Sequence, residues 1–205
     1  MSKKIRKKSS KSGSSGTARA ATVNRLKPAR NVDMTASEKP KSGLTSSFSQ
    51  AGELAEGSPA PPFNLPREDG THVSLADFAG TKLVIFFYPR AGTRGCTREA
   101  MDFTRLAKEF AASGTTVMGV SSDSVKAQES FRNKHKLSIP LVSDEKHDML
   151  KAYNAWGEKS MYGKTFTGVL RTTVLVDEAG RVARIWRRVK IEGHADDVLA
   201  AARRL

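Results

Sequence analysis

The one cysteine of the chain, Cys96, stands among residues that favour a reactive thiolate. It follows a strand-like apolar run and a short loop, and it lies at the predicted first turn of a helix. Backbone N–H groups in that turn lack intrahelical acceptors, and the helix end is partly positive. Arg90, Thr93, Arg94 and Arg98 lie close to it along the chain. Because the thiolate is the nucleophilic form of cysteine, the pattern predicts attack on an electrophile.

The composition excludes several other kinds of site. One thiol among 205 residues cannot form an intramolecular disulfide, an internal two-cysteine redox cycle or a cysteine-rich zinc site. The four histidines show no metal-ligand spacing, so no metal is expected. No stretch approaches the roughly 18 to 20 apolar residues of a membrane-spanning helix, so no membrane association is expected. A lone cysteine is often a small buried apolar residue, but the charged context favours the reactive alternative.

The elements on either side of the cysteine follow from the apolar pattern. Residues 83–88 form a continuous apolar run that ends at Pro89, which is typical of a buried central strand. Between residues 95 and 112, apolar side chains recur at spacings of three and four, which predicts one face of a helix that ends at Gly114. Residues 116–121 then predict a second buried strand.

The remaining elements continue the alternation of strands and helices. The expected ranges are 63–65 and 72–74 for a short ribbon, 124–135 for a helix capped by Asp123 or Ser124, 141–143 for a strand, 146–153 for a short helix, 172–176 and 182–186 for a hairpin, and 194–203 for a last helix. This order predicts an α/β fold in which a mixed β-sheet is flanked by helices on both faces. The domain is expected to span residues 54–205.

Residues 1–50 differ from the rest of the chain in charge and texture. They contain twelve basic and two acidic residues, against 23 basic and 19 acidic residues in the remainder. Most of the net charge of +14 therefore belongs to this segment. It is rich in serine and lysine, has Phe48 as its one aromatic residue and shows no periodicity, which predicts a disordered basic tail.

The basic tail leaves three roles open. It is either a solubilising extension, a weak and nonspecific contact to nucleic acid that weakens steeply with salt, or a targeting segment. A secretory signal is excluded because no apolar segment follows the basic start, whereas an organellar transit peptide fits the composition. Without a secretory signal, the expected location is cytoplasmic.

The residues next to the cysteine resemble a known family. The pattern Pro89-x-x-x-Thr93-x-x-Cys96 is similar to the active-site signature of peroxiredoxins, and residues 87–89 and 96–103 resemble the bacterioferritin comigratory protein or PrxQ branch. Further segments that resemble this branch follow in order, at residues 139–144, 155–159, 161–164 and 168–177. The tail lies outside the resemblance.

The resemblance covers roughly residues 54–205, and it implies a thioredoxin-like fold and thiol-dependent reduction of hydrogen peroxide and organic hydroperoxides. It implies that Cys96 attacks the peroxide and becomes a sulfenic acid. By the same resemblance, Thr93 hydrogen-bonds the peroxide, and Arg171 stabilises the thiolate and orients the O–O bond. Pro89 shields the site. The resemblance implies no cofactor, neither a metal nor a flavin.

Two positions depart from the branch. Met101 stands where many members carry a resolving cysteine, five residues after Cys96, so the sulfenic acid needs an external thiol. Thioredoxin, glutaredoxin and a small thiol such as glutathione are the expected reductants. Arg94 stands where proline is common, which predicts altered substrate preference. Glu99, near the helix start, is expected to favour the helix N-terminus rather than transfer protons.

A second class of function rests on the basic tail. A nucleic-acid-associated redox sensor would bind nucleic acid through residues 1–50 and change a partner contact when Cys96 is oxidised. A catalytically weak scaffold is a third reading. The presence of Thr93 and Arg171 together with the cysteine favours the peroxidase, because packing alone does not require this trio. The branch resemblance implies a monomer or a weak dimer.

Overall fold

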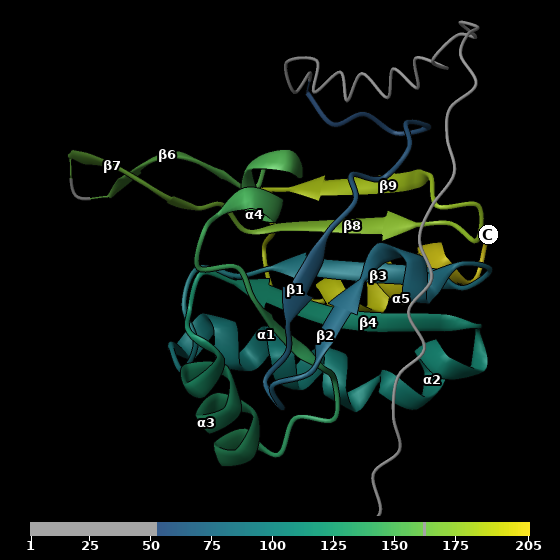
Figure 1. The fold of residues 1–205 in the computed structure, drawn as a ribbon, viewed down its shortest axis with the longest axis horizontal. Helices are drawn as coiled ribbons and strands as arrows, with labels where there is room; N and C mark the ends of the chain where they lie inside the picture. The colour runs from purple at the N-terminus through teal and green to yellow at the C-terminus, as the bar shows by residue number, and fades with distance from the viewer. Residues whose placement is uncertain (1–52, 162) are drawn as a thin grey trace, which may run out of the picture. The chain divides into compact units, whose positions relative to one another are not determined.

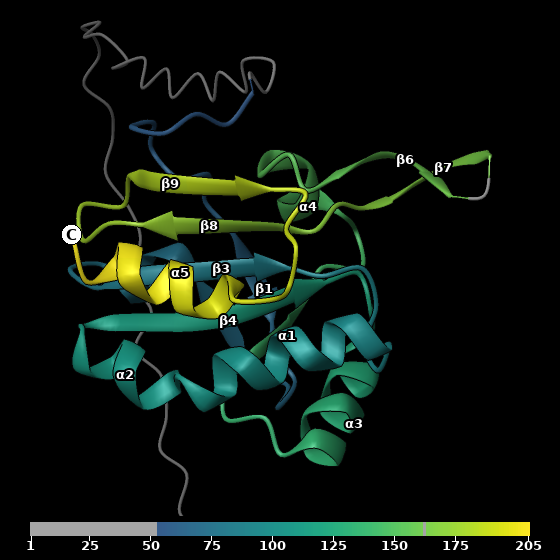
Figure 2. The ribbon, with the colours of Figure 1, turned by 180° about the vertical axis from the view of Figure 1, so that it is seen from behind.

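The computed structural model describes residues 53–161 and 163–205. The predictions about residues 1–50, which concern disorder, nucleic-acid contact and targeting, lie outside the described residues. Among the described residues, no helix is long and apolar enough to cross a membrane. The described residues form a mixed five-stranded sheet with helices on both faces, as the sequence predicts (Figures 1 and 2).

The central sheet has the strand order β5-β4-β3-β8-β9. Strands β3 (Lys82–Phe87), β4 (Thr115–Ser121) and β5 (Leu141–Ser143) are parallel, whereas β8 (Thr172–Val176) runs antiparallel to β3 and β9 (Val182–Arg187) antiparallel to β8. The end of β3, the start of β8 and the end of β9 therefore share one edge of the sheet. Figure 2 shows the arrowheads of β3 and β9 pointing to this edge.

Four helices cover one face of the sheet. They are α1 (Arg94–Arg105), α2 (Ala107–Ala112), α3 (Val125–His135) and α5 (His194–Ala202). Figure 2 shows α1, α2 and α5 in front of the strands. Their apolar side chains form one core cluster with the strand residues that point to this side. The parallel neighbours β3, β4 and β5 need crossover connections, and α1, α2 and α3 provide them on this face.

The opposite face carries smaller elements. They are the antiparallel ribbon of β1 (Asn64–Pro66) and β2 (His72–Ser74), the 3-10 helix η1 (Leu75–Phe78) and the short helix α4 (Asp148–Ala152). Figure 1 shows the ribbon and α4 in front of the sheet. A second core cluster lies between these elements and the strands.

Strand β3 joins the two core clusters. Its side chains alternate between them, with Val84 and Phe86 in the helix-side cluster and Leu83, Ile85 and Phe87 in the other, and all five are fully buried. A strand buried on both faces has a continuous apolar sequence rather than an alternating one. This explains why the apolar run at 83–88 predicts the central strand.

The predicted helix over residues 95–112 is in fact two helices. The break lies at Leu106, where the backbone has φ −94° and ψ 3°. Phe103, Leu106 and Phe110 are all buried, at 0%, 3% and 0% exposure. The apolar spacing continues across the break, so periodicity alone did not indicate it.

A second ribbon was not predicted. Strands β6 (Trp156–Met161) and β7 (Lys164–Val169) pair antiparallel and form a two-stranded sheet of their own. Figures 1 and 2 both show this ribbon extending away from the central sheet. Its sequence is polar and glycine-containing, so it lacks the apolar alternation that predicts a half-buried strand.

Candidate active site

Cys96 occupies the first turn of α1, directly after the loop that follows β3. Thr93 is the N-cap residue with extended backbone angles, and Cys96 is the third helical residue. The N–H groups of such a first turn have no acceptor within the helix and point toward the helix start. Cys96 is 1% exposed and belongs to the helix-side core cluster. The strand, loop and helix predicted around the cysteine are thus confirmed.

Arg171 reaches the sulfur from the neighbouring strand. Its Nη2 donates a hydrogen bond to Cys96 Sγ at 3.3 Å. The contact follows from strand register, because Phe87 at the end of β3 pairs with Thr172 at the start of β8. Arg171, one residue before Thr172, therefore lies beside the start of α1. The sheet brings together two residues that are 75 positions apart in the sequence.

Glu99 holds the other side of the guanidinium. Its Oε2 accepts a hydrogen bond from Nη1 of Arg171, and the carboxylate is 1% exposed while the Arg171 side chain is 16% exposed. Burial raises the pKa of Glu99 to about 7 against the lowering effect of Arg171. Burial lowers the pKa of the Arg171 guanidinium. The neighbouring Glu99 and Cys96 outweigh this effect, so the pKa lies above its ordinary value.

The expected role of Glu99 at the helix N-terminus was wrong. Glu99 is the sixth residue of α1 and faces Arg171 rather than the open helix end. Its Oε1 is buried without a hydrogen-bond partner, so the ion pair with Arg171 is its main polar contact among the described residues. A salt bridge buried to this degree requires good geometry to offset the desolvation of both charges.

Thr93 and Pro89 lie in the loop that leads to the cysteine. The Thr93 hydroxyl is exposed and donates to the carbonyl of Arg90 at 3.1 Å, while its own carbonyl accepts from the N–H of Thr97 at 2.8 Å. Pro89 is half-buried. Within the described part of the chain, no hydrogen bond joins Thr93 to Cys96. The structure therefore brings Arg171 to the sulfur and places Thr93 at the loop surface beside it.

Comparison with known proteins gives the family. Residues 57–185 match the AhpC/TSA family. The chain is 46% identical over 145 residues to peroxiredoxin Bcp of Xanthomonas campestris, which covers 70% of this chain and 91% of that protein. It is 38% identical over 146 residues to peroxiredoxin Bcp of Escherichia coli, and this match covers 71% of this chain and 94% of that protein. The chain belongs to the peroxiredoxins of the AhpC/TSA family.

The fold of this peroxiredoxin is confirmed by a solved relative. The structure of the bacterioferritin comigratory protein of Xanthomonas campestris, described for its alkyl peroxide reduction activity, matches with a TM-score of 0.67 and 43% identity. The match covers 69% of this chain and 90% of that chain. The protein is thus a thiol peroxidase of the Bcp/PrxQ branch with a thioredoxin-like fold, as the resemblance implied.

A hydrogen-bonded chain that the sequence did not predict holds the loop of this peroxiredoxin. Asp123 Oδ2 accepts from the N–H of Ala91 at 2.7 Å and from the hydroxyl of Ser121 at 2.8 Å. Gln128 Nε2 donates to Ser121 Oγ at 2.8 Å, and the hydroxyl of Tyr88 donates to Gln128 Oε1. The chain ties the loop at Ala91 to β4 and α3. The sequence predicts Asp123 only as a candidate cap of α3.

The cap of α3 is the neighbouring serine. Ser124 Oγ accepts from the N–H of Ala127 at 3.4 Å, which leaves Asp123 free to bind the loop. Nothing in the spacing of residues 121–128 indicates the long-range contact to Ala91. The sequence feature that could have indicated it is a carboxylate two residues after the buried strand β4, whose carboxyl end lies on the same side of the sheet as Cys96.

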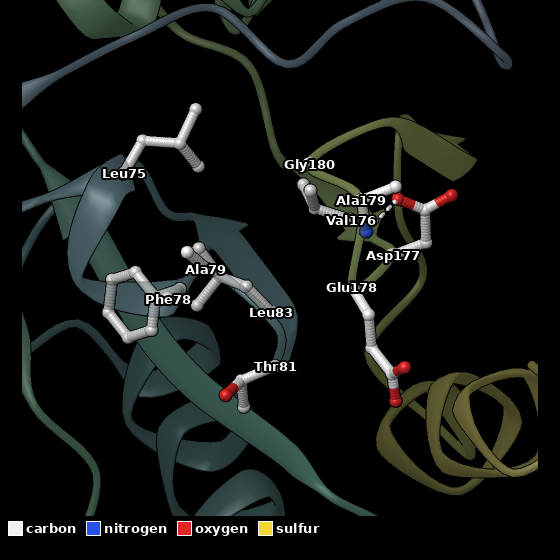
Figure 3. A pocket seen from close by; sticks show the side chains of 10 residues that line it. All are labelled: Leu75, Phe78, Ala79, Thr81, Leu83, Val176, Asp177, Glu178, Ala179 and Gly180. Carbon is white, nitrogen blue, oxygen red and sulfur yellow. Dashed lines mark hydrogen bonds between the residues drawn. The ribbon is translucent and has the colours of Figure 1, made fainter.

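A hollow at the far edge of the sheet is not part of this site. Figure 3 shows Leu75 and Phe78 of η1 on one side of it and the turn between β8 and β9 on the other. Leu83 near the start of β3 and Val176 at the end of β8 also line it. This hollow of about 250 Å³ lies near the start of β3, whereas Cys96 follows the end of β3. The hollow and the sulfur are therefore at opposite ends of the strand.

Proposed function

We propose that this peroxiredoxin reduces hydrogen peroxide and organic hydroperoxides through a sulfenic acid on Cys96, in a one-cysteine cycle completed by an external thiol. The observation that carries the proposal is the hydrogen bond of 3.3 Å from Arg171 Nη2 to Cys96 Sγ at the start of α1. The alkyl peroxide reduction activity described for the relative from Xanthomonas campestris supports the organic peroxide as a substrate.

In the first half of the cycle, the Cys96 thiolate attacks one oxygen of the peroxide. The S–O bond forms as the O–O bond breaks, and the leaving oxygen takes a proton to become water or an alcohol, while Cys96 becomes a sulfenic acid. Arg171 and the first-turn N–H groups provide positive charge where the leaving oxygen becomes negative. In this proposal Thr93 hydrogen-bonds the peroxide, and Pro89 shields the sulfur from water.

The second half of the cycle requires a thiol from outside the chain. The chain has one cysteine, and Met101, at the place of the resolving cysteine in many members, is an exposed thioether that cannot form a disulfide. One external thiol displaces the sulfenic oxygen as water and forms a mixed disulfide with Cys96, and a second thiol releases the Cys96 thiol. Thioredoxin, glutaredoxin and small thiols supply this chemistry, and a reducing compartment such as the cytoplasm suits it.

The test is the intact mass of the reduced protein after one equivalent of hydrogen peroxide, in the presence of a dimedone-type sulfenate trap. Rapid trapping is expected for the wild type, and none for the Cys96→Ser variant. The same protein should then turn over peroxide continuously when excess 2-mercaptoethanol is added. Oxidation of Cys96 as slow as that of a free thiol would refute the proposal.

A further inference from the structure

The arginines of the domain fall into those with a carboxylate partner and those without one, and three of the second kind lie near Cys96. Within residues 53–161 and 163–205, most arginines have a carboxylate within 4.0 Å. They include Arg67, Arg105, Arg132, Arg184 and Arg203. In this part of the chain, five arginines have no carboxylate within 4.0 Å. Arg181 and Arg204 lie away from the site, whereas Arg90, Arg94 and Arg188 belong to segments that meet near Cys96. Arg171 and Arg98 at the same place are paired with Glu99 and Glu192, so the positive charge that no ion pair offsets there is that of Arg90, Arg94 and Arg188.

The loop between β9 and α5 brings part of this charge to the site. The N–H of Val189 donates to the carbonyl of Arg171 at 3.2 Å. Ile191 Cδ1 lies 3.1 Å from the point where a side-chain carbon on Gly95 would stand, so the loop packs against the first turn of α1. Figure 2 shows the loop running from the end of β9 past the start of β8 to α5. Arg188 and Lys190 are exposed on it.

A hollow lies between the end of β9, this loop and the start of α5. It has a volume of about 540 Å³, and the cations that line it are Arg187, Arg188 and Lys190. Two carboxylates also line it. Asp197 accepts a hydrogen bond from Trp186 Nε1 at 2.8 Å and lies 4.0 Å from Arg184, and Glu192 lies 4.0 Å from Arg98. Arg187 lies 3.5 Å from Glu53, so Arg188 and Lys190 are the cations of the hollow without an anionic partner among the described residues.

We infer that the external thiol of the cycle is a small anionic thiol, whose carboxylates bind the cationic rim formed by Arg94, Arg188 and Lys190. This inference rests on the one-cysteine cycle proposed above. Positive charge beside a reaction centre concentrates anions there and raises association rates by roughly 10- to 1000-fold at low ionic strength. The rim is exposed, so salt should screen the effect.

A small thiol suits the site better than a protein thiol. Cys96 is 1% exposed, so an attacking sulfur must enter a narrow approach. The hollow beside this approach is lined by residues of β9, the following loop and α5, and not by Cys96. Its volume of about 540 Å³ lies within the roughly 300 to 1,000 Å³ that is typical of small-molecule sites. An acidic protein surface is the other anionic occupant, and the test below distinguishes the two.

The reaction balances with the thiol alone. The thiol sulfur attacks the sulfur of the Cys96 sulfenic acid, the S–O bond breaks, and the oxygen leaves as water with the proton of the thiol. A second molecule of thiol then attacks the mixed disulfide and releases Cys96 and the oxidised thiol. Two thiols are oxidised and one peroxide is reduced, so no other reductant is needed.

The experiment measures the rate of sulfenic acid reduction with three probes at equal thiolate concentration. They are glutathione, which is anionic, 2-mercaptoethanol, which is neutral, and cysteamine, which is cationic. At about 20 mM salt, glutathione should react at least about tenfold faster than 2-mercaptoethanol and cysteamine slowest, and about 500 mM salt should remove most of the difference. Equal rates for the three probes would overturn the inference.

Variants locate the charge that is responsible. Arg188→Gln and Lys190→Gln should each lower the ratio of the glutathione rate to the 2-mercaptoethanol rate about threefold, which is typical of the loss of one exposed charge pair. Arg181→Gln is the matched control, because Arg181 lies at the opposite end of β9 and should leave the ratio unchanged. An unchanged ratio in both rim variants would also overturn the inference.

The outcomes separate this inference from the proposed function. If 2-mercaptoethanol supports turnover but charge has no effect, the one-cysteine cycle stands and the anionic thiol is wrong. If no thiol reduces the sulfenic acid, the cycle itself fails. If glutathione has no advantage while an acidic thioredoxin reduces Cys96 in a manner that depends on Arg188, the partner is a protein, and the small-thiol inference is overturned.

Discussion

The carboxylate of Glu99 accepts a hydrogen bond from Nη1 of Arg171, while Nη2 of the same guanidinium donates to the sulfur of Cys96. Glu99 follows Cys96 by three residues on α1, so both lie on the same face of the helix. The planar fork of the arginine therefore bridges one helical turn, and its position relative to the sulfur is fixed by the carboxylate. A single ammonium group has no such fork.

Replacement of Arg171 by lysine should therefore slow the peroxidase reaction although the charge is kept. We expect Arg171→Lys to reduce the second-order rate constant for oxidation of Cys96 by hydrogen peroxide about 100-fold, the usual loss for one donor to a developing oxyanion. Stopped-flow competition with a peroxidase of known rate measures it. Arg181→Lys, at an exposed arginine remote from Cys96, is the control. A loss of less than about threefold would show that charge alone is sufficient.

The loop anchor at Asp123 should affect peroxide more than other electrophiles. Asp123→Asn weakens the hydrogen bond to the N–H of Ala91, which is 2.7 Å long in the wild type, and lets the loop that carries Thr93 shift. Because small displacements of positioning groups reduce rates strongly, we expect oxidation of Cys96 by peroxide to slow about tenfold. Alkylation by iodoacetamide, which does not require Thr93, should change by less than about twofold.

The ratio of the two rates is the measurement that matters for Asp123. A merely structural loss would expose Cys96 and raise its alkylation, whereas a positioning role lowers peroxide reactivity alone. Glu129→Gln is a suitable control, because Glu129 is an exposed carboxylate on α3 near Asp123 in sequence. If alkylation and peroxide oxidation change in parallel in Asp123→Asn, the anchor does not act through the geometry of the site.

The sequence predicted the parts of this site that depend on local pattern. The apolar run of β3 and the helix after it are local signals, and they place Cys96 at a helix start. The contact of Arg171 with the sulfur depends on the pairing of Phe87 with Thr172, which is a long-range register. Its role was therefore available only from the family resemblance, and the structure then supplied the geometry.

The contacts that the sequence did not predict are all tertiary. Asp123 and Glu99 are carboxylates at positions where a local explanation, a helix cap or a helix dipole, was sufficient. Their actual partners, Ala91 and Arg171, are brought to them by packing of the loop and of β8. The β6–β7 ribbon has no buried face along most of its length, so hydrophobic patterning did not indicate it.

The packing of β3 and β4 against α1, the helix that carries Cys96, should be disturbed by a single methyl group added at Gly119. A Cβ on Gly119 of β4 would stand 2.6 Å from Phe86 Cζ and 3.0 Å from Leu141 Cδ2. Phe86 stacks on Phe103 of α1, with ring centroids 4.6 Å apart. Gly119→Ala should therefore lower the free energy of unfolding by about 1 to 3 kcal/mol, as overpacked cores do. Urea denaturation measures it, with Ser130→Ala on the exposed surface of α3 as control.

Overpacking at Gly119 should also change the geometry of the active site. Because Phe103 lies on the helix that carries Cys96, a shift of the Phe86 ring moves α1 relative to Arg171. We expect oxidation of Cys96 by peroxide to slow in Gly119→Ala at temperatures where the variant is fully folded. Unchanged stability would mean that the Phe86 ring adjusts without cost.

The buried carboxylate of Glu99 should make stability depend on pH. Burial raises its pKa to about 7 from the ordinary 4.5, so between these values the folded protein holds a proton that the unfolded chain has released. The free energy of unfolding contributed by this group is therefore present below about pH 4.5 and is lost as the pH rises through about 7. Glu99→Gln carries no titrating proton. Its stability relative to the wild type should rise over this window, by up to about 3 kcal/mol.

Urea unfolding of both proteins at a series of pH values measures this difference. His194 titrates in the opposite sense, because burial lowers its pKa to about 4 and its contribution is lost as the pH falls from about 6.5. That contribution is common to the wild type and Glu99→Gln, so it cancels when the two curves are subtracted. A difference curve that is flat from about pH 4.5 to 8 would mean that Glu99 stays ionised beside Arg171, and that the attraction of the guanidinium exceeds the effect of burial.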